Sequence, residues 1–529
     1  SHCGDALLNP VSYTRRISTF ISCGLLFVAA GCPNQSTDVS EIDLRGRHAL
    51  AGSDAHLSRA IQGLERVERY DPQQARSQVI SQLSQWIDNQ PPVDDWSAEP
   101  LLNTLPARYG PVFRGSPMKQ LEFLGSDYFA LSEAVWLRQI ADWQIDEKAR
   151  QRELLQVRVD DLAAEVRSLE VAAENDQTES QPLANVREKL AAAQAKLNPG
   201  WLEELRTAEG EQAYEDLTIA MWLFDWTTRN VRLDETHWDA IPLLDGKLDE
   251  KAASADDKTP PNPPPGGALH AWQGLLLGHA DAVTRARIFL LLAQQKKVDV
   301  VMLGLEDPEG KQEPRTWAAG VIAGNRIYLF DAELGLPLPA PNGEGICTWS
   351  ELRDHPEILR QLDVDDLKYP VAEADLENVV ALIDGTPQHL SQRMMLVERK
   401  LQGDQKLVLT SAPSPLARRL RKMSLPKAKI WTARYLALLF EFVRQQHPQL
   451  EGELFREMTL YNPPIRLFEA RLHHFRGELN EPTQVSLQGA GQEQHGARHF
   501  YLACRDPQGE IQRIDDEIED WFAQFPAEP

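Results

Sequence analysis

Cysteine is scarce in this chain, which has 5 cysteines among 529 residues. Cys3, Cys23 and Cys32 lie near the N-terminus, and no Cys-x-x-Cys pair occurs. This distribution excludes a disulfide-rich scaffold and the usual cysteine-based zinc site. We expect Cys347 and Cys504 to be separate buried thiols, although a disulfide between them stays open because an exported protein allows one.

Positive charge is in short supply as well. Lys and Arg number 55 against 79 Asp and Glu, which gives a net charge of −24. Nucleic-acid binding requires a basic face, so this balance argues against it. Phosphate-binding loops, dinucleotide fingerprints and nucleophile elbows are absent too, and we predict no cofactor. His495 and His499 have a metal-ligand spacing, but Gly496 interrupts it and no third ligand is near, so we predict no metal site.

Long apolar runs are missing, and the N-terminal run at 21–30 is too short to span a bilayer. Arg15 and Arg16 precede this run, and small residues lead from it to Cys32. The pattern resembles a bacterial lipoprotein signal, which implies acylation of Cys32. We therefore expect a signal peptide over 1–31, a tether over 32–48 and a lipid-anchored protein in the cell envelope or periplasm. An ordinary cleaved signal peptide and an uncleaved anchor remain alternatives.

The remainder has the composition of a multidomain globular protein of the α+β class, with 42% apolar residues. Apolar residues alternate at spacings of four and three over 153–171 and resume over 183–197, which predicts an antiparallel, coiled-coil-like hairpin. This hairpin is interpreted either as an arm that binds envelope proteins or as a solvated insertion. We divide the chain into a helical region (49–143), the hairpin arm (144–200), a core (201–350) and a mixed α/β C-terminal region (351–529).

The division is centred on the stretch from Gly278 to Pro341, which lies within the core. Its apolar residues predict a buried helix over 282–293, followed by strands near 298–304, 316–322 and 328–331. Gly324 and Asn325 form a two-residue hairpin signal between the last two strands.

This order of elements resembles the core of transglutaminase-like domains, a branch of the papain-like fold. The residues that carry the resemblance are Ala286, Phe289, Leu292, Trp317 and Asp331, together with the 298–304 strand. The resemblance implies a Cys–His–Asp triad at positions 282, 316 and 331. The chain has Ala282, Thr316 and Asp331 there, so the nucleophile and the base are missing.

We therefore predict a non-catalytic binding or scaffolding protein. The alternative is an atypical amidase or peptide-acting hydrolase that uses Asp331 with His279 or Thr284. A third possibility is a structural envelope component that assembles through the 153–197 hairpin.

The two-residue loop also predicts the register of the strands around it, with paired residue numbers adding to 649. Asp331 then lies opposite Ala318, and Thr316 lies on the same sheet face as Asp331 because side chains alternate along a strand. We expect Ala282 to face Thr316 across a small cleft. Beyond the core, we expect strands at 406–410 and 429–432 around a helix at 415–423, and a β-rich piece over 460–472 and 499–505.

Overall fold

The computed structural model describes residues 54–67, 72–109, 118–176, 181–234, 270–308, 313–432, 465–480, 496–504 and 512. Residues 51–529 belong to one compact unit. The signal, the tether and Cys32 therefore lie outside the described residues, as does His495. Within the described residues no helix has the length and apolar character needed to cross a membrane.

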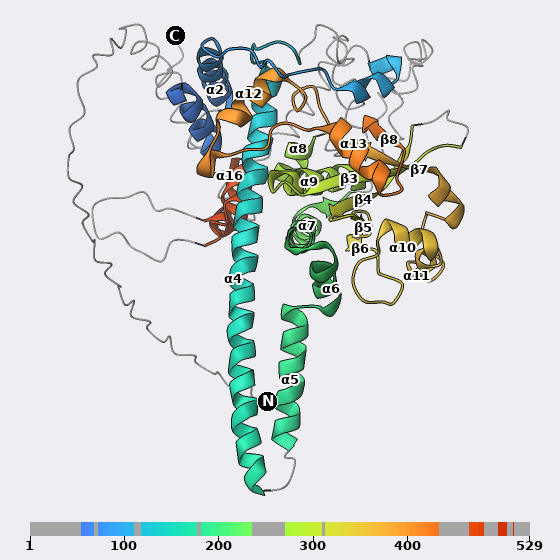
Figure 1. Cartoon of the computed structure of the whole chain (residues 1–529). Coiled ribbons are helices and arrows are strands. Elements are labelled where there is room, and N and C mark those ends of the chain that lie inside the picture. The colour runs from blue at the N-terminus through green and yellow to red at the C-terminus, as the bar shows by residue number, and fades with distance from the viewer. Residues whose placement is uncertain are drawn as a thin grey trace, which may run out of the picture. The chain divides into compact units, whose positions relative to one another are not determined.

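The described part combines helices with one six-stranded sheet, which confirms the mixed α+β class (Figure 1). The strand order is β6-β5-β4-β3-β7-β8, and all neighbours are antiparallel except β7 and β8. Strands from both sides of the expected boundary after residue 350 belong to this sheet. The strands are β3 (Asp299–Leu305), β4 (Arg315–Ala323), β5 (Arg326–Asp331), β6 (Leu336–Pro337), β7 (Val379–Ile383) and β8 (Ala428–Ile430).

Both faces of this sheet are buried, which explains why its strands are continuously apolar. Along β3, Met302 belongs to one hydrophobic cluster, and its neighbours Val301 and Leu303 belong to another. We call these the first and the second cluster, and the sheet separates them. The first cluster includes residues of α7 (Glu211–Asn230), α8 (Ala271–Leu277) and α9 (Ala282–Gln295). The second includes residues of α10 (Trp349–Asp354), α11 (Ile358–Gln361) and α13 (Pro413–Lys422).

The arm is built on a single helix, α4 (Gly125–Asp176), of 52 residues. At 1.5 Å per residue it is roughly 78 Å long. The first helix of the expected hairpin, over 153–171, is continuous with the end of the helical region before it, because no Gly or Pro lies between Gly125 and residue 171 to end the helix. α5 (Gln181–Leu197) runs back along its distal half, and the two share a hydrophobic cluster of their own (Figure 1). The expected helical hairpin is thus present.

Further helices complete the described part. One spans residues 54–65, α2 is Pro72–Ile87 and α6 is Gly200–Glu209. α12 is Gln392–Lys400, and short 3-10 turns are η2 (Pro100–Thr104), η3 (Ala107–Tyr109), η6 (Glu373–Asn378) and η7 (Gly403–Gln405).

The C-terminal expectations fail in two places. Residues 406–410 form no strand, because their backbone N–H groups bond to side chains: Val408 donates to Gln295, and Leu409 donates to Glu398. The pieces expected to be β-rich are the helices α16 (Ile465–Phe475) and α17 (Ala497–Ala503). In α16, Phe468, Leu472 and Phe475 follow a helical spacing of four and three. The strand near 429–432 is confirmed as β8, which pairs in parallel with β7.

Candidate functional site

The hairpin that was expected to carry the site has the predicted register. Ala323 pairs with Arg326, and the pairing continues to Ala319 opposite Phe330, so that paired numbers add to 649. Gly324 has a φ of +60°, which suits the tight turn.

A β-bulge on the other side of β4 changes which way Thr316 faces. Leu303 pairs with Ala318, but the next residue, Gly304, pairs with Thr316, which leaves Trp317 as the extra residue. Trp317 and Ala318 both join the second cluster. Thr316 therefore lies with Gly304 on the face of the first cluster, the face that α9 covers.

Asp331 lies on the opposite face. Its carboxylate accepts a hydrogen bond of 2.5 Å from the Tyr369 hydroxyl, which accepts one of 2.7 Å from Trp317 Nε1. Trp317 and Tyr369 both belong to the second cluster. The expected convergence of positions 282, 316 and 331 is therefore wrong. The bulge turns Thr316 away from Asp331, and Asp331 itself lies on the face that α9 does not cover.

The three positions still lie at one end of the sheet. Ala282 is the first residue of α9, and Arg285 one turn later donates a hydrogen bond of 3.1 Å to the Ala332 carbonyl. The end of β5 and the first turn of α9 are thus close. Because β4 and β5 are antiparallel, the start of β4, which carries Thr316, lies at this end as well.

The surroundings of Asp331 are structural in character. Its Oδ1 accepts the backbone N–H groups of Glu333 at 2.8 Å and Leu334 at 2.9 Å, which closes the turn after β5. Burial raises the pKa of Asp331, and its hydrogen bonds oppose this shift. Burial and the neighbouring Asp331 charge also raise the pKa of Tyr369 far above its usual range. Both oxygens of the Asp331 carboxylate and the Tyr369 hydroxyl thus have hydrogen-bond partners within the protein.

Two buried arginines on α9 complete the inner surface of this end. Arg285 bonds to the carbonyls of Thr228 and Ala332, and burial lowers its pKa against the attraction of Asp331. Arg287 bonds to the Asp384 carboxylate at 3.1 Å, with Glu133 3.6 Å away. Burial acts to lower the pKa of Arg287, but these two acids outweigh it and raise the pKa. The sequence signal for both was a charge inside an otherwise apolar helix, which requires buried partners.

The alternative catalytic residues do not join Asp331. His279 lies in β2 (His279–Ala280), which pairs with β1 (Arg232–Leu233), and its Nδ1 bonds to the Asp234 carboxylate. Thr284 is buried, and its N–H donates to the Asp281 carboxylate at 2.7 Å, which caps α9. His279 and Thr284 thus have local partners of their own.

The buried thiol of Cys347 is poorly suited to act as a nucleophile. Cys347 is fully buried, and burial, with the nearby Glu351 charge, raises the pKa of its thiol to about 12. Cys347 is a free thiol, so its disulfide with Cys504, left open above, is not formed. The expectation of two buried thiols holds for Cys347 only, because Cys504 is exposed. Among the described residues no group of three or more His, Cys, Asp or Glu side chains could hold a metal ion.

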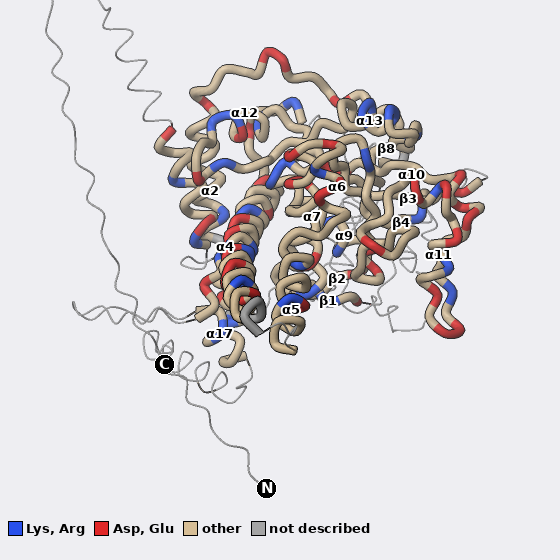
Figure 2. The backbone as a smooth tube through the Cα atoms, turned by 60° about the horizontal axis from the view of Figure 1, so that its bottom comes forward, with Lys and Arg blue, Asp and Glu red and all other residues tan. Residues whose placement is uncertain are grey.

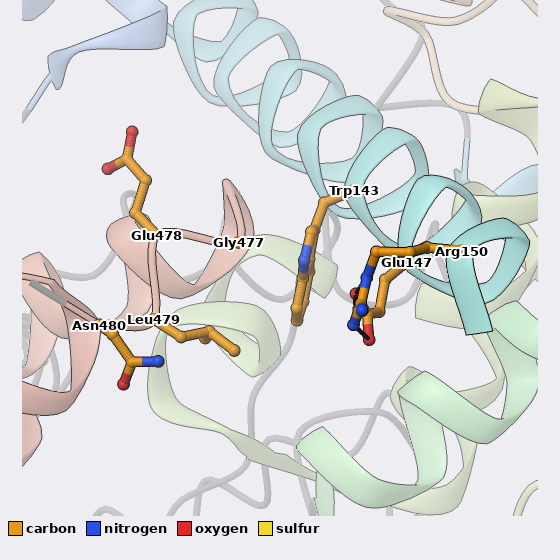
Figure 3. A pocket seen from close by; sticks show the side chains of 7 residues that line it. All are labelled: Trp143, Glu147, Arg150, Gly477, Glu478, Leu479 and Asn480. Carbon is orange, nitrogen blue, oxygen red and sulfur yellow. Dashed lines mark hydrogen bonds and ion pairs between the residues drawn. The ribbon is translucent and has the colours of Figure 1, made fainter. Parts of the chain in front are cut away.

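A separate pocket of about 460 Å³ lies between α4 and the segment after α16 (Figure 3). Trp143, Glu147 and Arg150 line it from α4, and the Leu479 side chain points toward the Trp143 ring. Arg150 and Glu147 form an ion pair of 2.7 Å. No local sequence pattern predicts this pocket, because its two walls are more than 300 residues apart in the chain.

Comparison of the chain with protein-family models, with curated proteins and with solved structures finds no match in any of the three.

Proposed function

We propose that this protein is a non-catalytic binding or scaffolding protein of the cell envelope, held by an N-terminal lipid on Cys32. One observation carries the non-catalytic part. At the end of the sheet where a transglutaminase-like triad would assemble, Ala282 has no reactive group, and Thr316 and Asp331 face opposite sides of the sheet. Nucleophilic catalysis needs a nucleophile and a base in contact, and neither is present there.

The order of elements supports a transglutaminase-like ancestry of the core. A buried helix, α9, is followed by the antiparallel strands β3, β4 and β5, which is the order the resemblance implies. The chain differs from the family pattern in two ways: the Cys and His positions hold Ala282 and Thr316, and Thr316 and Asp331 lie on opposite faces of the sheet. A fold can keep its architecture after its chemistry is gone.

The arm supports the binding part of the proposal. The arm has its own hydrophobic cluster, so the core does not need a projecting arm in order to fold. A surface that binds a partner, in contrast, has to project to where the partner can reach it.

Two measurements test this proposal. Hydrolysis of peptide and amide libraries by the full chain should equal that of Asp331→Asn, with Asp366→Asn on an exposed loop as the matched control. Activity that disappears only in Asp331→Asn would overturn it. Pull-down from membranes should recover partners with the full chain and lose them when a short Gly/Ser loop replaces 153–197.

A second candidate is the atypical amidase or peptide-acting hydrolase. The observation in its favour is the pair His279–Asp234, because a carboxylate that orients a histidine is part of many hydrolytic sites. The His279 side chain is 28% exposed, so substrate can reach it. Hydrolysis lost in His279→Gln but kept in His355→Gln, an exposed histidine beside Glu357, would favour this candidate.

A further inference from the structure

The arm has a second apolar stripe that α5 does not cover. α5 packs on Leu155, Val159, Leu162, Val166 and Leu169 of α4. At 100° per residue, the second stripe lies roughly 150° further round the helix. It includes Leu154, Val157 and Val171, which are 58%, 57% and 63% exposed. Its members follow spacings of three and four: Leu154, Val157, Asp161, Ala164, Ser168 and Val171.

Charged side chains flank this stripe in a pattern of opposite signs. Arg158 and Glu165 lie along one edge, and Asp160 and Arg167 lie along the other. All four are exposed. Among the described residues Arg158, Glu165 and Arg167 make no ion pair, and Asp160 accepts a hydrogen bond of 2.9 Å from Gln156. Acidic and basic residues alternate along the α4 tube in Figure 2.

We propose that this stripe is a homodimer surface, on which α4 of a second copy packs antiparallel about a two-fold axis. The inference rests on the proposal that the arm is a binding surface, and it names the partner. In the register where facing residue numbers add to 325, Leu154 meets the partner's Val171 and Val157 meets the partner's Ser168. Asp161 then meets the partner's Ala164, whose small side chain leaves the carboxylate access to water.

The charges select this register. The edge residues lie between the facing layers of the seam. Arg158 lies beside the partner's Glu165 on one edge (numbers adding to 323), and Asp160 lies beside the partner's Arg167 on the other (numbers adding to 327). The two-fold axis repeats each contact, so four pairs of opposite charge flank the seam. Such flanking pairs set partner choice and orientation in coiled coils. A parallel pairing would instead bring Asp160 against the partner's Glu165, which is repulsive.

In the same register, the pocket between α4 and the segment after α16 lies at one end of the dimer seam. Trp143, Glu147 and Arg150 continue the stripe toward the core at spacings of four and three. Arg150 faces residue 175 in this register, so the distal end of the partner's α4 lies at the pocket in Figure 3.

The test is a mixing experiment with charge reversals in the full chain, followed by sedimentation equilibrium. For the unmodified protein the fraction of dimer should rise with concentration. We expect weak association because the seam contains Asp161 and Ser168 as well as apolar residues. Arg158→Glu alone and Glu165→Arg alone each place like charges at two contacts, and each should weaken association roughly tenfold or more. An equimolar mixture of the two variants should restore the dimer as a heterodimer, since all the affected contacts are then of opposite charge.

Lys189→Glu on the exposed surface of α5 is the matched control and should behave like the unmodified protein. Far-ultraviolet circular dichroism of each variant shows that the helices are retained. Association that ignores both reversals, or that the mixture does not restore, would overturn this register. A monomer at every concentration that still recovers a different envelope protein through the arm would overturn the homodimer and leave the proposed function standing.

Discussion

At the scale of single residues, Tyr369 decides what Asp331 does. Its hydroxyl connects the Asp331 carboxylate to the Trp317 indole, across residues that are distant in the chain. All three side chains are less than a tenth exposed. Buried polar groups are destabilising unless they are paired, so this chain of hydrogen bonds ties the bulge in β4 to the end of β5. The acid that the family resemblance implied as catalytic is here hydrogen-bonded to Tyr369 and to the turn after β5.

Tyr369→Phe should therefore lower the free energy of unfolding by about 2–4 kcal/mol, because it leaves a buried carboxylate oxygen and a buried indole N–H without this partner. Urea unfolding measures the change. Tyr328→Phe is the matched control on the other face of the sheet. Tyr328 is as well buried, but Arg326 beside it has a side chain that is 43% exposed, so water can replace that contact. Equal losses in both variants would contradict a special role for Tyr369.

Glu478 provides a pH-dependent prediction at the same scale. Burial acts to raise its pKa, but hydrogen bonds from His473 and Arg476 and the charge of Arg66 hold the pKa at about 2, below the ordinary 4.5. A carboxyl with a lowered folded-state pKa stabilises the fold above its unfolded pKa and loses this effect as the pH falls. The difference in urea midpoint between the unmodified protein and Glu478→Gln should be largest above pH 4.5 and shrink as the pH falls toward about 2. A difference that stays constant over this range would contradict the prediction.

At the scale of elements, the sequence predicted those features that depend on residues close together in the chain. The buried helix α9, the hairpin register and the α4/α5 pair follow from apolar spacing and one two-residue turn. The bulge at Trp317 was not predictable from this hairpin, because it lies where β4 pairs with β3, and Trp317 there donates a hydrogen bond to Tyr369, 52 residues further along the chain. That one extra residue turned Thr316 to the other sheet face and separated it from Asp331. The register of the β4–β5 hairpin therefore does not determine which residues face each other at a site that also depends on how β4 pairs with β3.

The segment 406–410 fails for a related reason. Its short apolar run, Leu407 to Leu409, resembles a strand, and Leu407 and Leu409 are indeed buried. Its backbone groups, however, are satisfied by the side chains of Gln295 and Glu398 rather than by a neighbouring strand. The five residues 406–410 alone do not show whether their backbone groups bond to a neighbouring strand or to side chains.

The arm should be detachable as an element. Its cluster shares no residues with the first or second cluster. Arg152 also donates a hydrogen bond of 2.9 Å to the Asn198 side chain, so the two ends of the arm lie side by side. Replacing 153–197 with a short Gly/Ser loop should leave the thermal midpoint of the remainder within a few degrees and remove the concentration-dependent association. Collapse of the whole fold would show that the arm stabilises the core.

At the scale of the whole molecule, the net charge opposes the proposed membrane attachment. The net charge of −24 repels the protein from an anionic membrane surface. Basic side chains in and after α13 are partly neutralised, because Lys427 and Lys429 both form ion pairs with Glu306, and Arg419 forms one with Asp299. Membrane attachment, as proposed, therefore depends on a lipid rather than on electrostatic attraction.

The change Cys32→Ser tests that dependence directly. Acylation uses the cysteine sulfur, and each acyl CH₂ buried in a bilayer contributes about 0.8 kcal/mol. Without the lipid, the net negative charge leaves little to retain the protein. Cys32→Ser should shift the protein from the membrane fraction to the soluble fraction, or leave the uncleaved precursor, and intact mass distinguishes these results. Cys23→Ser, the same substitution within the apolar run, should keep both the mature mass and the membrane retention. If Cys32→Ser also keeps both, the lipid anchor is wrong, and the cleaved-signal and uncleaved-anchor alternatives are then separated by whether the mature mass includes residues 1–31.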